Sequence, residues 1–188
     1  MDFEKLTYEF VVEKCIWHKE NSEDHYDFWN EHIKYVYEEA IKQAKTFNAD
    51  EEIVKMGALL HDIALIQMVG TRAEHHINGA KIAEEFLRGI NYPEDRLKRV
   101  VGCVLHHRKS QNAENNEELC VADSDILAHF DNIPMLFDLM FNSLHMSLEE
   151  VHKKMPEYLE KDFEDMSERT REIFKDKYED YKKILIIW

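Results

Sequence analysis

The stretch GALLHDIALI, residues 57–66, places His61 directly before Asp62 inside an apolar run. Burying an ionisable pair in such surroundings is unfavourable unless another group pairs with it. A divalent cation bound by both side chains would compensate the buried carboxylate. The neighbouring side chains are apolar, so the remaining ligands of such an ion must come from other parts of the chain.

Further histidines and aspartates lie on the apolar faces of predicted helices. His32 is one of these, and Asp123 and Asp125 lie close together in a later segment. Taken singly, each has an ordinary structural role as a core hydrogen-bonding group or a helix cap. Together with His61 and Asp62, His32 and one of the two aspartates would supply two imidazoles and two carboxylates. That set suits Mn(II), Fe(II), Co(II), Ni(II) or Zn(II), and suits Mg(II) less well.

The elements that must position these residues are helices, because the apolar residues recur every three or four positions almost throughout. Asp50 is expected to cap one helix, and Ser147 with Glu150 to form a capping box. The expected helices cover about 3–17, 26–44, 50–63, 75–89 and 93–107, with further helices beginning near 117, 134 and 147. We therefore predict an all-α, single-domain helical bundle over residues 1–188. Its motif-bearing core spans about 26–130, and C-terminal helices fill 131–188.

Composition excludes several classes of protein. The net charge is -15, from 39 acidic and 24 basic residues, which argues against binding nucleic-acid polymers or anionic membranes. No apolar run is long enough to span a bilayer and no secretory signal is visible, so a cytoplasmic location is expected. The three cysteines form no CxxC motif, which predicts neither a disulfide framework nor a thiolate zinc site. The C-terminal ILIIW is expected to fold back on the core or to support a homodimer.

The order of the candidate ligands resembles the HD-domain superfamily of metal-dependent phosphohydrolases, and in particular its small stand-alone members. The matching stretches are DFWNEHIKYVYEEA, GALLHDIA, HHINGAKIAEEFL, VVGCVLHHR and ADSDIL. The resemblance implies that His32, His61, Asp62 and Asp125 are metal ligands. It favours Asp125 over Asp123, although Ile126 stands where the family usually has a basic residue. Asp123 is then expected to support a ligand or to contact the substrate.

The resemblance also implies a second ion in some members, held here by His76 and His107. These two are preferred over their neighbours His75 and His106 because the residues around them match the family better, but either neighbour is an alternative ligand. With both ions present, a hydroxide would bridge the two ions, and both ions would bind a phosphate. With one ion, the two histidines would contact substrate phosphate instead.

The implied reaction is hydrolysis of a nucleotide or another small phosphate ester or anhydride by metal-activated water. Asp62, His76 and His107 are the expected catalytic residues, and Asp62 would also orient the water. His75 or His106, if not bound to metal, is an alternative general acid. The residues expected to bind substrate are Arg72, Lys81, Arg108 and Asp123, although the three basic ones would also suit an ordinary charged surface.

Other activities are distinguished by specific features. The segment after the second histidine pair lacks the GYP sequence of members that hydrolyse cyclic diguanylate, and the chain is shorter than the triphosphohydrolase and alarmone-hydrolase members. Two alternatives stay open. One is a di-iron oxygenase with the same ligands, which metal analysis and spectroscopy of anaerobically purified protein would reveal. The other is a non-catalytic metal-binding or nucleotide-binding regulatory module, which would cleave no phosphoester.

Overall fold

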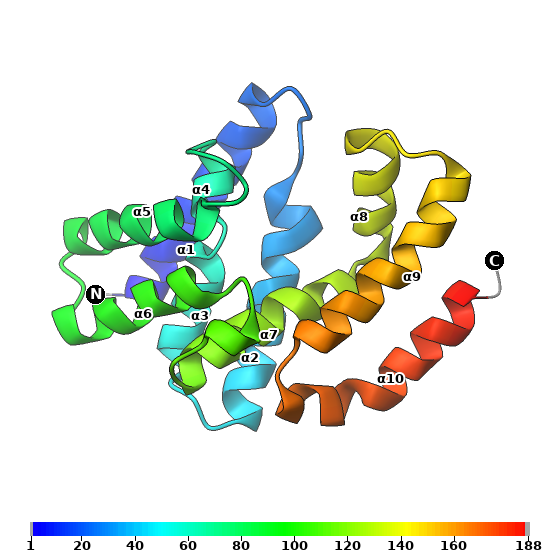
Figure 1. Cartoon of the computed structure of the whole chain (residues 1–188). Helices are drawn as coiled ribbons and strands as arrows, with labels where there is room; N and C mark the ends of the chain where they lie inside the picture. Colours follow the sequence, from blue (N-terminus) through cyan, green and yellow to red (C-terminus); the bar gives the residue numbers. More distant parts are fainter. Residues whose placement is uncertain (1, 187–188) are drawn as a thin grey trace.

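A computed structural model describes residues 2–186, and all regular structure in that range is helical, as predicted (Figure 1). The helices are α1 (Phe3–Asn21), α2 (Lys34–Thr46), α3 (Glu51–Leu60), α4 (Ile63–Ile66), α5 (His75–Gly89), α6 (Glu94–His106), α7 (Asn116–Asp131), α8 (Ile133–Asp138), α9 (Leu148–Asp165) and α10 (Glu168–Ile186). Two short π-helical turns, η1 (Trp29–Ile33) and η3 (Leu139–Ser143), and one 3-10 turn, η2 (Ser110–Asn112), complete the set.

Polar caps fix where several of these helices begin. The Asp50 side chain accepts a hydrogen bond from the Ile53 amide at the start of α3. Ser147 and Glu150 form the predicted capping box at the start of α9. Each such cap satisfies backbone N–H groups that have no partner inside the first helical turn.

The helix that was expected to run through Ile63 is interrupted at the His-Asp pair. Helix α3 ends at Leu60, and Asp62 has φ -101° and ψ 16°, outside the helical range. The physical reason is local, because the His61 ring donates from Nδ1 to the Ala58 carbonyl, 2.7 Å away. In a continuous helix that carbonyl would accept from the Asp62 amide. The break sets His61 and Asp62 at a corner between α3 and α4.

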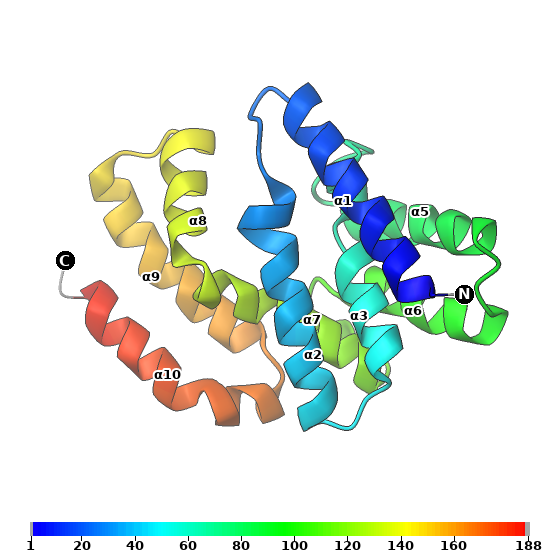
Figure 2. The same ribbon diagram turned by 180° about the vertical axis from the view of Figure 1, so that it is seen from behind.

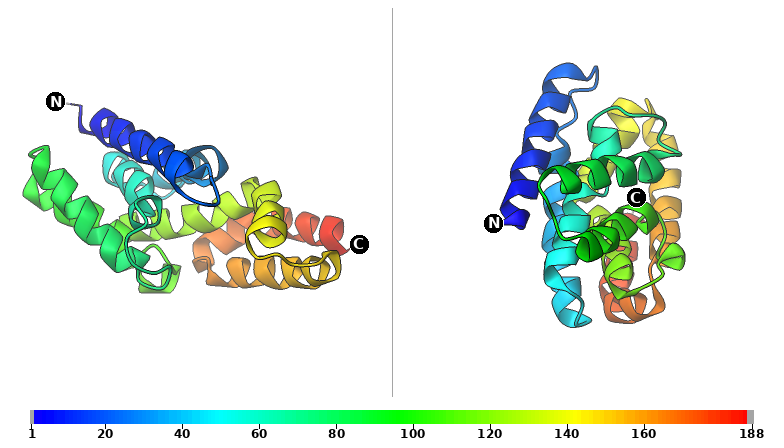
Figure 3. Two further views of the ribbon diagram at one scale, coloured as in Figure 1. Left: turned by 90° about the horizontal axis from the view of Figure 1, so that it is seen from above. Right: turned by 90° about the vertical axis from the view of Figure 1, so that its left-hand side faces the viewer.

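Helix α7 lies between two apolar clusters, and Figures 2 and 3 show it running through the middle of the molecule. One cluster joins the helices from α1 to α6 with α7, where it includes Val121 and Ala128. The other joins the second half of α7 to α8, α9 and α10 through residues such as Phe130. Helix α7 thus packs against both clusters.

Within the C-terminal third, α10 packs against α9. The Phe163 ring of α9 stacks on Tyr178 of α10, with centroids 4.0 Å apart. Most of the apolar segment 184–188 lies outside the residues whose side chains the structure describes, so its predicted role in a homodimer stays a prediction. Cys15, Cys103 and Cys120 are buried free thiols. None of the helices over residues 2–186 combines the length and the apolar character needed to cross a bilayer.

Candidate metal centre

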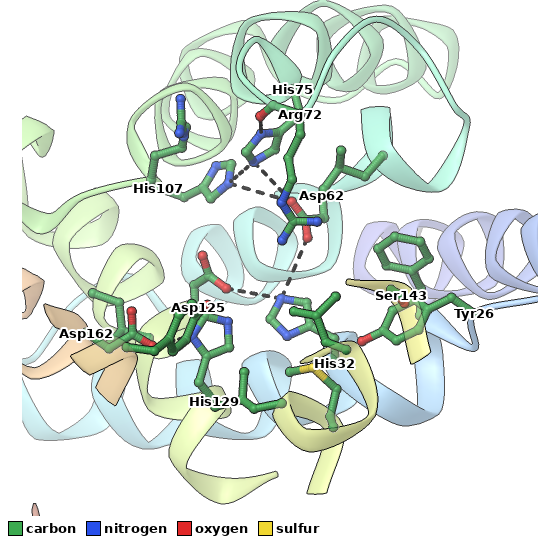
Figure 4. Close-up of a pocket in the computed structure, with 18 of the residues that line it drawn as sticks. Tyr26, His32, Asp62, Arg72, His75, His107, Asp125, His129, Ser143 and Asp162 are labelled. Carbon is green, nitrogen blue, oxygen red and sulfur yellow. Dashed lines mark hydrogen bonds and ion pairs between the residues drawn. The ribbon is translucent and has the colours of Figure 1, made fainter. Parts of the chain in front are cut away.

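Most of the candidate ligands line a cavity of about 390 Å³, and His61 lies fully buried against two of them, His32 and Asp62. Figure 4 shows the side chains of His32, Asp62, Asp125 and His107 converging on this space. They come from η1, the corner after α3, the middle of α7 and the end of α6. Residues far apart in the sequence are thus brought to one point by the packing of α2, α3 and α6 on α7.

The first group of donor atoms contains the four expected ligands of one ion. His32 Nε2 lies 3.1 Å from His61 Nε2 and 3.1 Å from Asp125 Oδ1. Asp62 Oδ2 lies 3.6 Å from His61 Nε2 and 3.7 Å from His32 Nε2. Donor atoms bound to a common ion at about 2.0–2.2 Å stand at separations of this size. The two histidines thus lie within this distance of both Asp62 and Asp125, and His32, His61 and Asp62 are close enough together to share an ion.

A second group lies on the other side of the Asp62 carboxylate. Asp62 Oδ1 is 3.2 Å from His75 Nε2 and 3.8 Å from His107 Nε2. The two histidine nitrogens are themselves 2.9 Å apart. One oxygen of Asp62 thus faces each group, which is the arrangement of a carboxylate that bridges two ions.

Three of the histidines are held by the same local device. In each, the ring Nδ1 donates to the backbone carbonyl three residues earlier, and the pairs are His61–Ala58, His75–Arg72 and His107–Val104, all at 2.7 Å. A carbonyl accepts but never donates, so Nδ1 carries a proton, and in the neutral ring the Nε2 lone pair points into the cavity. Metal-binding histidines are fixed in the same way by a hydrogen bond from their other nitrogen.

Lone pairs that face one another repel unless a positive charge lies between them. The neutral rings of His75 and His107 bring two such lone pairs together, and the His61 Nε2 lone pair faces His32 Nε2, whose own proton no backbone carbonyl fixes on Nδ1. The donor set therefore fits a metal ion on either side of Asp62. The second ring nitrogen of His32, Nδ1, is buried without a hydrogen-bond partner among the described residues.

The carboxylates of the cluster are held in their ionised forms. Burial alone would raise the pKa of Asp62. Three neighbours outweigh burial and lower that pKa well below the usual range: the charge of His61, a hydrogen bond from His75 and the charge of His32. Burial also opposes ionisation of Asp125, and His32 and His61 lower its pKa strongly. Ionised carboxylates are the form that binds a cation.

The imidazoles differ in their protonation. Burial lowers the pKa of His107 to about 4 and also lowers that of His32, which favours the neutral ligand form. Burial would likewise lower the pKa of His75, but its hydrogen bond to Asp62 outweighs burial and raises it. A proton on His75 thus competes with any ion on that side of the site.

The structure corrects the preferred choice within the first histidine pair. His75 lines the cavity, whereas His76 lies on a different side of α5 and is not among the lining residues. Adjacent residues on a helix point about 100° apart, and the Arg72 carbonyl at the start of α5 aims the His75 ring inward. In the second pair the preference agrees with the geometry. His107 faces the cavity, and His106 pairs with Glu118 at 2.7 Å.

The two aspartates of α7 have different surroundings. Asp125 belongs to the cluster, as expected. Asp123 is fully buried and accepts hydrogen bonds from Ser110 Oγ at 2.6 Å, the Ser167 amide at 2.8 Å and Thr170 Oγ1 at 2.6 Å. Asp123 therefore does not contact the substrate space, and the assignment as a substrate-binding residue is corrected. Its carboxylate instead fastens the 3-10 turn and the start of α10 to α7.

Of the basic residues expected to bind substrate, two are well placed. Arg72 and Arg108 line the cavity, and Figure 4 shows the Arg72 side chain among the other residues that line it. Arg108 also donates to the Ala73 carbonyl at 2.8 Å, which ties the segment after α6 to the segment before α5. Lys81 is exposed on α5 and does not line the cavity, so its assignment is corrected too.

Several residues of the site were not anticipated. His129 lies four positions after Asp125 on α7, hence on the same helix face, and that spacing was a usable signal. Lys161 and Asp162 come from α9, where no motif marks them, and only the docking of α9 onto α7 brings them to the cavity.

Two curated proteins with the same name are similar in sequence to this chain. The chain is 28% identical to a tRNA (cytidine(56)-2'-O)-methyltransferase of Picrophilus torridus, over 78% of this chain and 47% of that relative. It is 31% identical to the protein of the same name from Thermoplasma volcanium, over 79% of this chain and 41% of the relative. The chain thus spans less than half the length of these curated relatives.

The fold is shared with a solved structure. The crystal structure of a predicted HD superfamily hydrolase from an uncultured Thermotogales bacterium matches 81% of this chain and 89% of that chain, with a TM-score of 0.58 and 17% identity. The family model for the HD domain matches residues 29–129, a segment that begins in η1 and ends in α7. All six residues of the two donor groups lie inside that segment, and the chain belongs to the HD-domain family.

Proposed function

We propose that this chain is a metal-dependent phosphohydrolase that acts on a nucleotide or another small phosphate ester or anhydride. The observation that carries the proposal is the Asp62 carboxylate, which presents one oxygen to His32 and His61 and the other to His75 and His107. Such a donor set suits one or two ions of Mn(II), Fe(II), Co(II), Ni(II) or Zn(II), and suits Mg(II) less.

A bound ion would supply a water of lowered pKa and would polarise a phosphoryl oxygen. The chain's own residues would hold the ion and bind the phosphate group of the substrate. Asp62 and Asp125 bring negative charge to hold the ion, and the guanidinium groups of Arg72 and Arg108 offer hydrogen bonds to phosphate oxygens. Phosphoryl transfer needs little more than such positioning and charge neutralisation.

The dimensions and lining of the cavity support a small substrate. A volume of about 390 Å³ lies within the usual range for small-molecule sites, roughly 300–1,000 Å³. Beyond the donor groups, Tyr26, Leu139 and Tyr158 provide apolar surface for the part of the substrate that carries the phosphate. The net charge of -15 argues against a nucleic-acid polymer as substrate and against an anionic membrane as partner. Methyl transfer, which names the curated relatives, is not part of this proposal, because the donor cluster gives no support for it.

A second candidate is an oxygenase that uses two iron ions. The observation that favours it is the complete second donor group, since His75 and His107 allow a dinuclear centre. Iron content and redox-dependent spectra of anaerobically purified protein distinguish this activity from hydrolysis, which leaves the oxidation state of the metal unchanged.

The proposal is tested by metal analysis of the purified protein, followed by a screen of phosphate esters and nucleotides with Mn(II), Mg(II), Co(II) and Ni(II). We expect release of inorganic phosphate from at least one substrate, and loss of that activity in Asp62→Ala. Bound metal without hydrolysis across the panel would favour a non-catalytic module. Activity that persists in Asp62→Ala would contradict the site.

A further inference from the structure

A histidine-carboxylate pair lies beside the donor groups and belongs to neither. His129 of α7 donates from Nδ1 to Asp162 Oδ2 of α9 at 2.8 Å. Asp162 is 8% exposed, and both residues line the same cavity as the donor cluster. Asp162 lies outside the segment that matches the HD-domain model, so the pair joins the C-terminal helices to the site.

The hydrogen bond to Asp162 occupies Nδ1 of His129 and leaves its other ring nitrogen, Nε2, free. The His129 ring stacks on that of His32, with centroids 5.6 Å apart and an interplanar angle of 24°. A nitrogen of His129 lies within 4.8 Å of donor atoms of both His32 and Asp125. Because Nδ1 is engaged by Asp162, Nε2 is the nitrogen free to act toward the ion, and Figure 4 shows the ring between Asp162 and His32.

His129 is engaged differently from His32. It forms an ion pair with Asp162 but none with Asp125, whereas His32 Nε2 lies 3.1 Å from Asp125 Oδ1. Because His32, Asp125 and His129 are still close enough to share an ion, the Co(II) affinity of a His129 variant separates direct coordination from contact with an oxygen bound to the ion.

We propose that His129 hydrogen-bonds through Nε2 to the exogenous oxygen ligand, either water or a phosphoryl oxygen, of an ion held by His32 and Asp125, and that Asp162 is the positioning residue that fixes the ring. This inference rests on the proposed function. It adds to the centre a substrate-contacting histidine and a positioning residue that none of the sequence motifs contains. Water and hydrogenphosphate each present an O–H to a nitrogen lone pair, so the contact suits both ligands.

The test uses Co(II)-loaded protein, whose visible spectrum reports both metal binding and the binding of inorganic phosphate to the metal. The variants are His129→Ala, Asp162→Ala and Asp162→Asn, and thermal melting checks that each is folded. Asn is the conservative variant because its amide oxygen still accepts from His129 Nδ1. His106→Ala is the matched control, since His106 forms an equivalent pair with Glu118 at 2.7 Å without lining the cavity.

In His129→Ala we expect Co(II) affinity within about threefold of wild type and phosphate affinity lowered by about tenfold or more, as for other residues that orient groups at a metal centre. Asp162→Ala should show a similar loss of phosphate affinity, Asp162→Asn should recover most of it, and His106→Ala should change neither affinity. A merely structural role would instead move the melting temperature without separating phosphate binding from Co(II) binding.

Three results would overturn the inference. Unchanged phosphate affinity in His129→Ala would remove the contact, and unchanged affinity in Asp162→Ala would remove the positioning role. Loss of Co(II) itself in a folded His129→Ala protein would make His129 a ligand. These failures leave the proposed function standing. Failure of the wild-type protein to bind Co(II) would overturn the metal centre and this inference together.

Discussion

The Nε2 atoms of His75 and His107 lie 2.9 Å apart, although both rings donate their Nδ1–H to backbone carbonyls. Two lone pairs therefore face each other at hydrogen-bond distance. A metal ion or a proton between them turns the contact from repulsion into attraction. A metal ion and a proton are thus expected to compete for one position. His76 and His106, the sequence neighbours of these histidines, should not bind that ion because they do not line the cavity.

The affinity of the ion bound by His75 should rise with pH. The hydrogen bond to Asp62 outweighs burial and raises the pKa of His75 above its usual 6.5, so its proton must leave before the ion binds. Below that pKa we expect about a tenfold loss of affinity per pH unit, and above it a plateau. Calorimetric titration with Mn(II) between about pH 5.5 and 8.5 measures this. Affinity that does not change over the range would contradict the role of His75.

Neighbouring histidines should behave differently when removed. We expect two Mn(II) ions per chain in the wild-type protein and one in His75→Ala, because the second donor group then keeps only Asp62 and His107. His76→Ala is the matched control and should retain two ions, since His76 does not line the cavity. Equilibrium dialysis with metal analysis gives the stoichiometry. The reverse pattern would restore His76 as the ligand.

The bridging position of Asp62 predicts a graded loss of metal. Asp62→Ala should lose both ions, because one oxygen serves each group. His61→Ala should weaken the first ion most, since His61 contributes to the first group alone. Turnover should fall by several orders of magnitude in both variants if the metal activates the water, as expected when a unit of catalytic residues is broken. Full metal content and full activity in either variant would show that the ligands are assigned wrongly.

Much of the fold can be predicted from local sequence. Periodicity places the helices, and caps such as Asp50 and Ser147 mark their starts, because both depend on residues a few positions apart. The choice between His75 and His76 does not depend on spacing alone. It is made by the Arg72 carbonyl, whose position follows from the backbone at the start of α5. The Asp162 contact to His129 is harder still to predict from the sequence, because it exists only through the docking of α9.

Close packing around Gly57, just before the His61-Asp62 corner, predicts that adding a single methyl group there destabilises the protein. A Cβ added to Gly57 of α3 would lie 2.6 Å from the Cys103 Cβ and 3.1 Å from Val121 Cγ2. We expect Gly57→Ala to lower the free energy of unfolding by about 1–3 kcal/mol. The loss should outweigh the gain of up to about 1 kcal/mol in helix propensity. Urea unfolding without added metal measures the difference.

Gly89 of α5 provides the control for that substitution. A Cβ there would meet nothing within 4 Å, so Gly89→Ala should leave stability unchanged or raise it. A Gly57→Ala protein as stable as the wild type would mean that α3 and α6 are less tightly packed behind the site than the structure indicates.

The bridging role of Asp62 is tested most directly by anomalous diffraction from crystals grown with Mn(II). The geometry predicts two anomalous peaks, one beside Asp62 Oδ2 near His32 and His61 and one beside Oδ1 near His75 and His107. Each should lie about 2.0–2.2 Å from its carboxylate oxygen. Fully loaded crystals without a peak within coordination distance of either Asp62 oxygen would contradict the account.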